Sequence, residues 1–334
     1  MELFWKERVE EKRSAVENVE TLSKIYTGVA CAEVLDNLID AAYAASSEML
    51  IPFIEEYLNK KGNELVENQY LLIQGYINPL KNILYRYTKK AGLKRICNDN
   101  LKSCGIMPRN IYQSFAMEAL LAPPEEIPLV ILQGAMGSGK VLLSLATALE
   151  KMINVQGMDA IRIVRGSLPS VDAQNSLMGL NLERNLSWAG SIRDDLRVVL
   201  EASGIPKKEI NRTIKDMLEE DTLSIESMKE IQGRSLPHST VIVVEAQETT
   251  QDQIIGILSN IAANTKIVLI GNLKQVENCG VIHPCTNGLA VISERMKGSS
   301  LCAQVVFGKS NSEKSPLAKE IAQRNLLIRH IRDT

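Results

Sequence analysis

The stretch Gly134-Ala135-Met136-Gly137-Ser138-Gly139-Lys140 lies between an apolar run at 127–132 and a helix-forming run at 142–150. Its spacing is typical of a phosphate-binding loop, in which glycines let consecutive backbone N–H groups face a phosphate. The helix that follows adds the positive end of its dipole, and Lys140 adds a point charge. The stretch therefore predicts a strand, a loop and a helix that bind a nucleotide, with residues 134–141 as candidate binding residues.

Position 141 departs from this motif, which places Ser or Thr after the lysine to hold Mg²⁺. Val141 has no oxygen to offer a hard cation, and such cations are bound almost entirely by oxygen ligands. The sequence thus predicts a nucleotide site in which Mg²⁺ is weakly held.

Length and composition indicate a globular protein of two domains, because 334 residues with 45% hydrophobic side chains can bury sizeable cores. The formal net charge of −2 argues against general binding of polyanions. The charge is uneven, since residues 81–102 carry seven basic side chains and one acidic side chain. Two interpretations of this basic stretch stay open: contacts to phosphates, or the solvated face of a helix.

Cysteine use and hydropathy predict the compartment. Six cysteines without a signal peptide favour reduced thiols in a cytoplasmic protein. No apolar run approaches the ~20 residues of a membrane span, so we expect no membrane partner. Cys279, His283 and Cys285 lie close together, but no second ligand pair at zinc-site spacing accompanies them. We therefore predict no metal centre from the sequence.

The first 104 residues are predicted to be helical almost throughout, with no strands. Helices are expected at 46–59, 64–75 and 79–91, separated by breakers such as Pro52, Gly62 and Pro79. Residues 1–104 are accordingly predicted to form an all-α N-terminal region of unknown role, suited to interaction or oligomerisation.

Residues 105–334 alternate between short apolar runs and helical patterns. Strands are expected at 127–133, 160–165, 240–245, 266–270 and 302–307. Helices are expected at 110–121, 140–152, 190–203, 207–220, 250–262, 287–297 and 315–329. Continuous apolar strands separated by helices are typical of a parallel sheet covered on both faces, which predicts an α/β fold. Ligands of such sheets bind beyond the carboxyl ends of the strands.

A second motif stands at the end of the strand at 240–245. In nucleotide hydrolases this strand usually ends in Asp-Glu, where the Asp helps to hold Mg²⁺ and the Glu positions the attacking water. Here Glu245 is present, and Val244 replaces the Asp. Glu245 is therefore a candidate catalytic residue together with Lys140; the alternative is a strand-end carboxylate near solvent. The next strand leads to a neutral Asn272.

Further residues accompany these motifs in a fixed order: Pro108-Arg109-Asn110 with Gln113, Val164-Arg165, Trp188 before Ile192-Arg193-Asp194, Gly233-Arg234-Ser235-Leu236, Glu245-Ala246-Gln247, Lys266-Ile267-Val268 with Gly271 and Gln275, Asn287-Gly288-Leu289, and residues 313–318. With this series, residues 105–330 resemble the PhoH-like family of P-loop ATPases, which is related to superfamily-one helicases. The first third of the chain matches no pattern of that family.

The resemblance implies roles for particular residues. Gln113 would recognise adenine, Lys140 would contact the terminal phosphates of ATP, and Glu245 would orient water. Gln275 would sense the nucleotide, and Lys314 would lie at the nucleotide site. The resemblance also implies a link to RNA or single-stranded nucleic acid, and a homo-oligomer, because related proteins form rings in which an arginine completes a neighbour's site.

The chain departs from the family at several of these positions. The family usually has Thr, Asp, Asp, Arg and Arg where this chain has Val141, Val244, Asn272, Gln232 and Lys314, and Asn260 replaces another Arg. Two oxygen ligands for Mg²⁺ are lost together, and a missing arginine finger alone can lower the rate by ~10³ or more. Weak hydrolysis is therefore expected. Three hypotheses stay open: an RNA-linked ATPase, a non-hydrolysing nucleotide sensor, and an oligomeric interaction scaffold.

Overall fold

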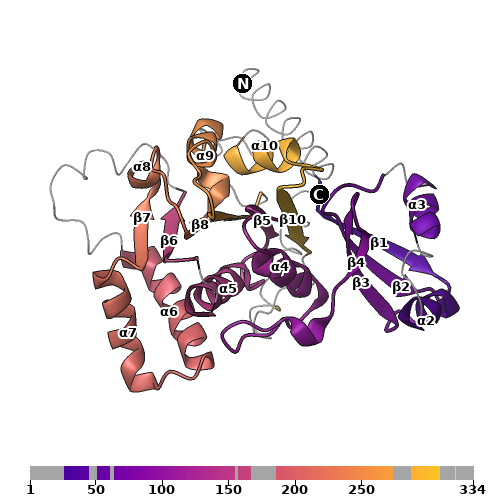
Figure 1. Cartoon of the computed structure of the whole chain (residues 1–334), viewed down its shortest axis with the longest axis horizontal. Helices are drawn as coiled ribbons and strands as arrows, with labels where there is room; N and C mark the ends of the chain where they lie inside the picture. Colours follow the sequence, from indigo (N-terminus) through magenta and orange to yellow (C-terminus); the bar gives the residue numbers. More distant parts are fainter. Residues whose placement is uncertain are drawn as a thin grey trace, which may run out of the picture.

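The computed structural model describes residues 26–44, 51–60, 64–154, 157–166, 186–273 and 287–308, together with Glu320. These residues form two sheets and the helices that cover them (Figure 1). The predicted helix at 315–329 and the first 25 residues lie outside the described ranges, apart from Glu320.

The larger sheet has six parallel strands in the order β10-β5-β9-β8-β6-β7. Their bounds are Leu129–Gly134 for β5, Ala160–Arg165 for β6, Leu223–Ser227 for β7, Ser239–Val244 for β8, Lys266–Gly271 for β9 and Cys302–Phe307 for β10. The predicted α/β fold with a parallel sheet is confirmed. β7 was not predicted, because this edge strand has only five residues, of which two are apolar.

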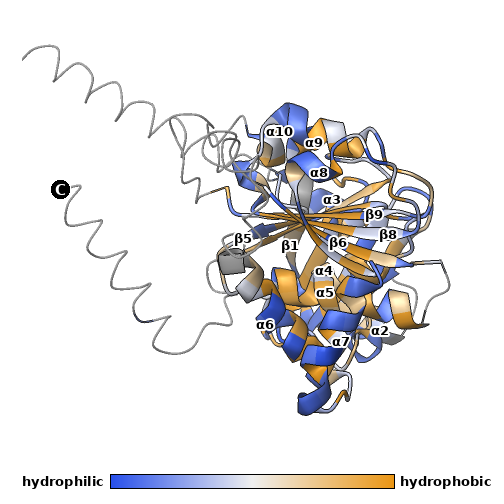
Figure 2. Cartoon of the chain, turned by 90° about the vertical axis from the view of Figure 1, so that its left-hand side faces the viewer, coloured by the Kyte–Doolittle hydropathy of each residue, from blue (hydrophilic) through white to orange (hydrophobic). Residues whose placement is uncertain are grey.

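Helices cover both faces of this sheet, which is seen edge-on in Figure 2. One face carries α4 (Ile111–Leu121), α5 (Lys140–Asn154), α6 (Leu186–Ala202) and α7 (Lys207–Glu219). The opposite face carries α8 (Met228–Ile231), α9 (Gln251–Leu258) and α10 (Gly288–Arg295). Two short 3-10 helices span Asn98–Asn100 (η2) and Ala246–Glu248 (η4). Among the described helices, none is long and apolar enough to cross a membrane.

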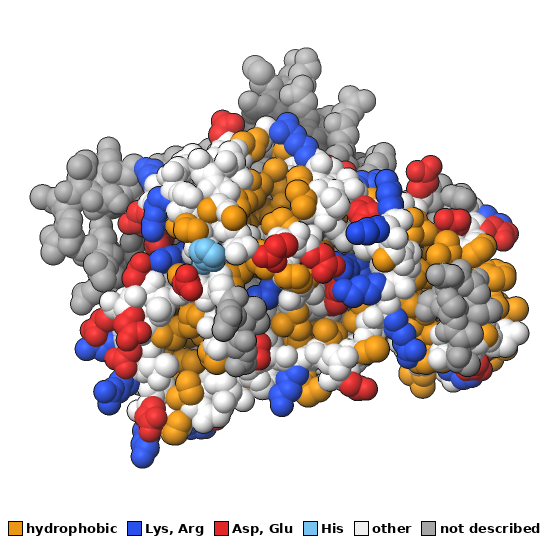
Figure 3. All heavy atoms as spheres, viewed as in Figure 1, with side chains coloured by type: hydrophobic (Ala, Val, Ile, Leu, Met, Phe, Trp, Pro, Cys, Tyr) orange, Lys and Arg blue, Asp and Glu red, His pale blue; other side chains and the backbone are white. Residues whose placement is uncertain are grey.

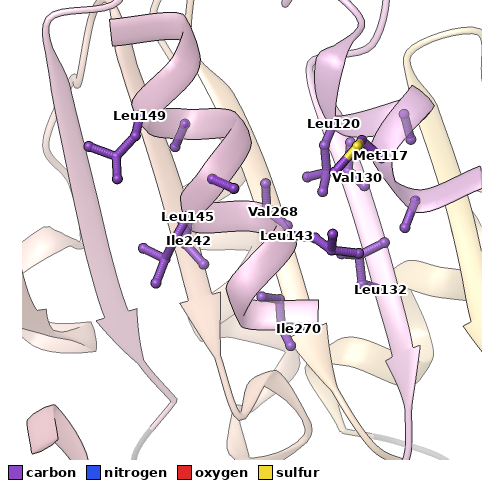
Figure 4. Close-up of a cluster of buried hydrophobic side chains, with 14 of the residues drawn as sticks. Met117, Leu120, Val130, Leu132, Leu143, Leu145, Leu149, Ile242, Val268 and Ile270 are labelled. Atoms are coloured by element: carbon purple, nitrogen blue, oxygen red, sulfur yellow. The ribbon is translucent and has the colours of Figure 1, made fainter. Parts of the chain in front are cut away.

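The hydrophobic core under α5 explains why this helix, which follows the loop at 134–140, packs against the sheet. Three leucines of α5 are at most 1% exposed: Leu143, Leu145 and Leu149. They share one hydrophobic core with Val130 of β5 and Ile242 of β8 (Figure 4). Burying each such side chain contributes roughly 1.5–3 kcal/mol. The amphipathic pattern of α5 thus fixes the helix, and with it the loop at its N-terminus, against the sheet.

The N-terminal region is not all-α, so that prediction is wrong. It contains a four-stranded sheet in the order β1-β2-β3-β4, with β1 parallel to β2 and the other pairs antiparallel. The strands span Val29–Val34 (β1), Tyr70–Gly75 (β2), Asn82–Thr88 (β3) and Gly92–Arg95 (β4), and the helices span Asp36–Ala44 (α2) and Ile51–Lys60 (α3).

The error concerns the predicted helices at 64–75 and 79–91, which contain β2 and β3. Both strands are apolar at successive positions because each face of this sheet is covered. Leu71 and Ile73 belong to a core with α2 and α3, whereas Tyr70 and Leu72 belong to the core of α4. A short continuous apolar run does not distinguish a buried strand from a helix by periodicity alone.

The basic stretch at 81–102 does not form the solvated face of a helix, so this one of its two interpretations is wrong. It runs through β3, β4 and the residues that follow. Lys89 and Lys90 are exposed at the turn between the two strands, whereas Arg86 is fully buried. The interpretation as a phosphate contact stays a prediction.

Helix α4 joins the two sheets. The ring of Phe115 lies 5.0 Å from the ring of Tyr70 on β2, centroid to centroid. The Tyr70 hydroxyl donates to Glu118 Oε2 at 2.8 Å, and burial raises the pKa of this tyrosine well above its ordinary value. Arg86 Nε lies 3.3 Å from Glu118 Oε1, and its guanidinium also donates to Glu126. The N-terminal sheet therefore shares a core with the larger sheet, and the predicted division at residues 104 and 105 stays a prediction.

We expect Arg86→Met to lower the free energy of unfolding by about 3–5 kcal/mol, because it removes the buried guanidinium beside the nearly buried Glu118 and leaves only the half-exposed Lys94, 3.8 Å away. Adding Glu118→Gln to this variant should recover part of the loss, since no buried charge then remains unpaired at that position. Urea unfolding followed by circular dichroism measures both changes. As a control, Lys60→Met removes an exposed pair with Glu56 and should leave the unfolding midpoint unchanged. A midpoint for Arg86→Met equal to that of the wild type would contradict this role of the ion pair.

Candidate functional site

The loop from Gly134 to Lys140 leaves the carboxyl end of β5 and turns sharply into α5. Gly134, Gly137 and Gly139 have φ of 136°, 79° and 83°, in the region that favours glycine. A Cβ atom at Gly134 would lie 2.7 Å from the backbone oxygen of Phe307, and one at Gly139 would lie 2.9 Å from Gln113 Nε2. The backbone conformation therefore favours glycine at both positions, and at Gly134 the backbone of Phe307 also leaves no space for a side chain.

Lys140 folds back over the loop that precedes it. Its Nζ donates to the backbone oxygens of Gly134 (2.7 Å) and Ala135 (2.9 Å), and to Ser138 Oγ (3.0 Å). The Ser138 hydroxyl in turn donates to the Ala135 oxygen at 3.0 Å. Lys140 is only 8% exposed, so its ammonium is held inside the curve of the loop. Phosphate oxygens are stronger acceptors for this ammonium than neutral carbonyls are.

Gln113 supports the loop from behind. Its Nε2 donates to the Ser138 backbone oxygen at 3.0 Å, and its Oε1 accepts from the Arg109 backbone N–H at 2.8 Å. The backbone N–H of Gln113 itself donates to the side chain of Asn110, which caps α4. The amide is 4% exposed, and an amide group has capacity for two further hydrogen bonds. The structure thus adds a bracing contact to Gln113, and the predicted contact with adenine stays a prediction.

Glu245 stands where β8 ends, in a left-handed conformation with φ of 52°. Its Oε2 accepts from Gln247 Nε2 at 2.5 Å. Gln247 is 2% exposed, and its Oε1 accepts from the Asn272 backbone N–H at 3.0 Å. One buried amide therefore ties the exposed Glu245 carboxylate to the chain just beyond β9. The sequence did not single out this role of Gln247, because the pairing depends on how two strand ends meet.

These elements enclose a cavity of about 290 Å³ at the carboxyl ends of the strands. Its lining residues are Gly134, Met136, Gly137, Gly139, Lys140, Val141, Leu142, Ser191, Asp195, Val244, Glu245, Ile270, Gly271 and Asn272. Most predicted loop residues and Glu245 thus share one cavity, while Ala135, Ser138 and Gln113 support it from within or behind the loop. The predicted Gln275 and Lys314 lie outside the described residues.

Two positions that differ from the expected family pattern lie away from this cavity. Gln232 packs so closely against Gly256 of α9 that a Cβ atom added at Gly256 would lie 2.8 Å from Gln232 Nε2. Asn260 donates its side-chain N–H to the oxygen of the same Gly256 at 2.7 Å. The two replaced arginine positions therefore meet on one helix, but neither lines the loop cavity.

Asp195 and Ser191 of α6 complete the cavity wall, and sequence analysis missed both. Burial, reinforced by the neighbouring charge of Asp194, raises the pKa of Asp195 to about 6. The neighbouring motif Ile192-Arg193-Asp194 contributed to the family resemblance, but no role at the site was predicted for it. Which of its residues face the cavity depends on the rotation of α6 about its own axis, and no local pattern gives that rotation.

Comparison with known proteins agrees with this geometry. A family model described as PhoH-like protein matches residues 105–325. The chain belongs to the PhoH-like family. This family is one of P-loop ATPases, so membership implies that the chain binds a nucleotide.

The chain is similar to several curated PhoH proteins. It is 31% identical to Protein PhoH2 of Bacillus subtilis (strain 168) over 227 residues, which cover 68% of this chain and 49% of that protein. It is 28% identical to Protein PhoH2 of Thermobispora bispora over 69% of this chain and 49% of that protein. It is 25% identical to Protein PhoH of Escherichia coli (strain K12) over 67% of this chain and 59% of that protein. The chain spans about half the length of the PhoH2 relatives.

Among solved structures, the chain is similar to the large terminase of a thermophilic bacteriophage. The TM-score is 0.35 and the identity is 10%, over 63% of this chain and 49% of the terminase chain. A likeness at this level is too weak to support a conclusion about function.

P-loop ATPases typically bind their nucleotide with Mg²⁺, and this cavity offers the ion no oxygen at two positions where the family usually supplies one. Val141 and Val244, which take the places of two oxygen ligands, both form part of its wall. Within the described ranges, no group of three or more His, Cys, Asp or Glu side chains could hold a metal ion. The two usual ligand positions thus supply no oxygen, whereas Ser191, Asp195 and Glu245 place other oxygens in the same wall.

We expect Gln113→Ala to weaken binding of inorganic tripolyphosphate as well as ATP, by about threefold to tenfold, because the loop loses the brace at Ser138. Titration calorimetry with both ligands measures this change. Any loss for ATP beyond the loss for tripolyphosphate measures the predicted recognition of adenine. Unchanged tripolyphosphate affinity in the variant would contradict the bracing role.

Proposed function

We propose that this PhoH-like chain binds ATP in the loop cavity, holds Mg²⁺ only weakly, and hydrolyses the nucleotide slowly. The observation that carries the proposal is a complete phosphate loop beside two valines. Gly134, Gly139 and Lys140 keep the required conformation and charge, whereas Val141 and Val244 line the same cavity without a ligand oxygen.

Slow hydrolysis follows from what phosphoryl transfer needs. The reaction depends on a positioned metal and on cations that neutralise the developing charge. Glu245 is fixed by Gln247 at a site suited to orienting water. A carboxylate without the metal beside it supplies only part of the catalytic apparatus. Residual activity therefore needs Glu245, and a non-hydrolysing nucleotide sensor is the alternative.

The link to RNA and the homo-oligomer rest on the family resemblance. On the face of the molecule in Figure 3, acidic and basic side chains of the described residues are interspersed and form no broad basic surface. A broad basic surface is what nucleic-acid-binding proteins usually present to the phosphates of their ligand. Nucleotide binding by the loop therefore has more physical support than either of these partners.

The test is titration calorimetry of ATP with the purified chain, in Mg²⁺ and in EDTA, alongside Lys140→Ala. Mg²⁺ should lower the dissociation constant of ATP by no more than about tenfold, because the ion acts only through the phosphates that it neutralises, and Lys140→Ala should weaken binding by about tenfold or more. Lys215→Ala on α7 is a matched control, because this lysine is exposed and pairs with Glu219 on its own helix. A strong requirement for Mg²⁺ would contradict the weakly held metal, and equal affinity of Lys140→Ala would contradict the loop as the site.

A restored variant tests the cause directly. Val141→Thr combined with Val244→Asp returns two oxygen ligands to the cavity wall, so Mg²⁺ should now strengthen ATP binding. Hydrolysis should rise in this variant and fall again when Glu245→Gln is added. If the restored chain gains neither metal dependence nor activity, defective metal coordination does not explain the site. Stimulation of hydrolysis by single-stranded RNA would favour the RNA-linked ATPase.

A further inference from the structure

The charges in the wall of the loop cavity are unbalanced. Of the residues that the structure describes there, Lys140 is the one cation, and Asp195 and Glu245 are both carboxylic acids. They come from different elements, Asp195 from α6 and Glu245 from the end of β8. Acidic groups from two different elements thus lie in the wall of this cavity.

The Glu245 carboxylate is held in place, and Asp195 is partly buried. Gln247 holds the Glu245 carboxylate through a 2.5 Å hydrogen bond and is itself anchored to the backbone of Asn272. Asp195 is half-buried on α6, a helix of 17 residues. Ile192 and Leu196 of the same helix are buried in the core. Since its pKa is about 6, Asp195 is ionised at pH 8. A negative ligand in the cavity therefore meets the charge of both carboxylates.

The number of phosphates on the nucleotide therefore matters. In a phosphate loop, backbone N–H groups cradle the α- and β-phosphates, and the lysine reaches the β- and γ-phosphates. The metal with additional cations neutralises the remaining charge of the third phosphate. Val141 and Val244 offer no ligand to that metal, so a third phosphate brings charge toward Asp195 and Glu245. A diphosphate uses the same loop contacts without this repulsion.

We infer that the cavity selects a metal-free nucleoside diphosphate over the triphosphate, and that Asp195 determines this selectivity. The inference rests on the proposed function, because it requires a nucleotide in the loop. It makes the diphosphate the ligand to which the chain responds, and it makes Asp195 a specificity-determining residue.

The test is competitive titration calorimetry of the full chain with AMP, ADP and ATP, in EDTA at pH 8. ADP should bind about tenfold more tightly than ATP, and AMP should bind most weakly because it lacks the β-phosphate. Asp195→Asn keeps the shape of the side chain and removes its charge, so the ratio should fall to about threefold or less. Asp194→Asn is the matched control, because that side chain is 74% exposed and pairs with Arg197 outside the cavity wall.

Each outcome decides between the inference and the proposal on which it rests. ATP that binds as tightly as ADP in EDTA would overturn the selectivity and leave nucleotide binding by the loop intact. A ratio that is unchanged in Asp195→Asn, or lowered equally in Asp194→Asn, would overturn the role of Asp195. Binding of none of the three nucleotides would overturn both the inference and the proposed function. The rise in melting temperature with each nucleotide provides a second readout that also reports whether each variant folds.

Discussion

The contact between the Lys140 ammonium and the oxygens of its own loop is the interaction on which the site depends. It requires the chain to curve so tightly that Gly134 and Ala135 both direct their oxygens at one nitrogen. That curve is compatible only with glycine where Phe307 approaches from β10, and it is braced on its other side by Gln113. The sheet and α4 together therefore hold the loop in its curved conformation before any ligand arrives.

Helix α4 gives the N-terminal sheet a place in this arrangement. Gln113 near the start of this helix contacts the loop, and Phe115 contacts Tyr70 of β2. One element therefore connects the loop to the N-terminal sheet. The buried Arg86 adds an ion pair between β3 and the same helix. The N-terminal residues thus pack on the helix that braces the nucleotide loop, and they are not an appendage joined to it by a linker.

Sequence alone predicted those parts of the fold whose signals are local. The loop, its flanking elements and Glu245 are specified by glycines, a lysine and an apolar strand within short windows. The strands β2 and β3 were missed because each is covered on both faces, which removes the alternation that distinguishes a strand from a helix. Asp195 and the bridging role of Gln247 were missed because they depend on the rotation of α6 and on the meeting of two strand ends.

A crystal structure of the chain grown with ADP and excess Mg²⁺ would test the chemistry of the site most directly. A site built for phosphates and not for their metal predicts diphosphate oxygens on the loop amides and on Lys140 Nζ. Any Mg²⁺ in that structure would be bound only by phosphate and water, as Val141 and Val244 require. A metal ion coordinated by Asp195, Glu245 or Asn272 would contradict this view and would show that the cavity has replaced its lost ligands.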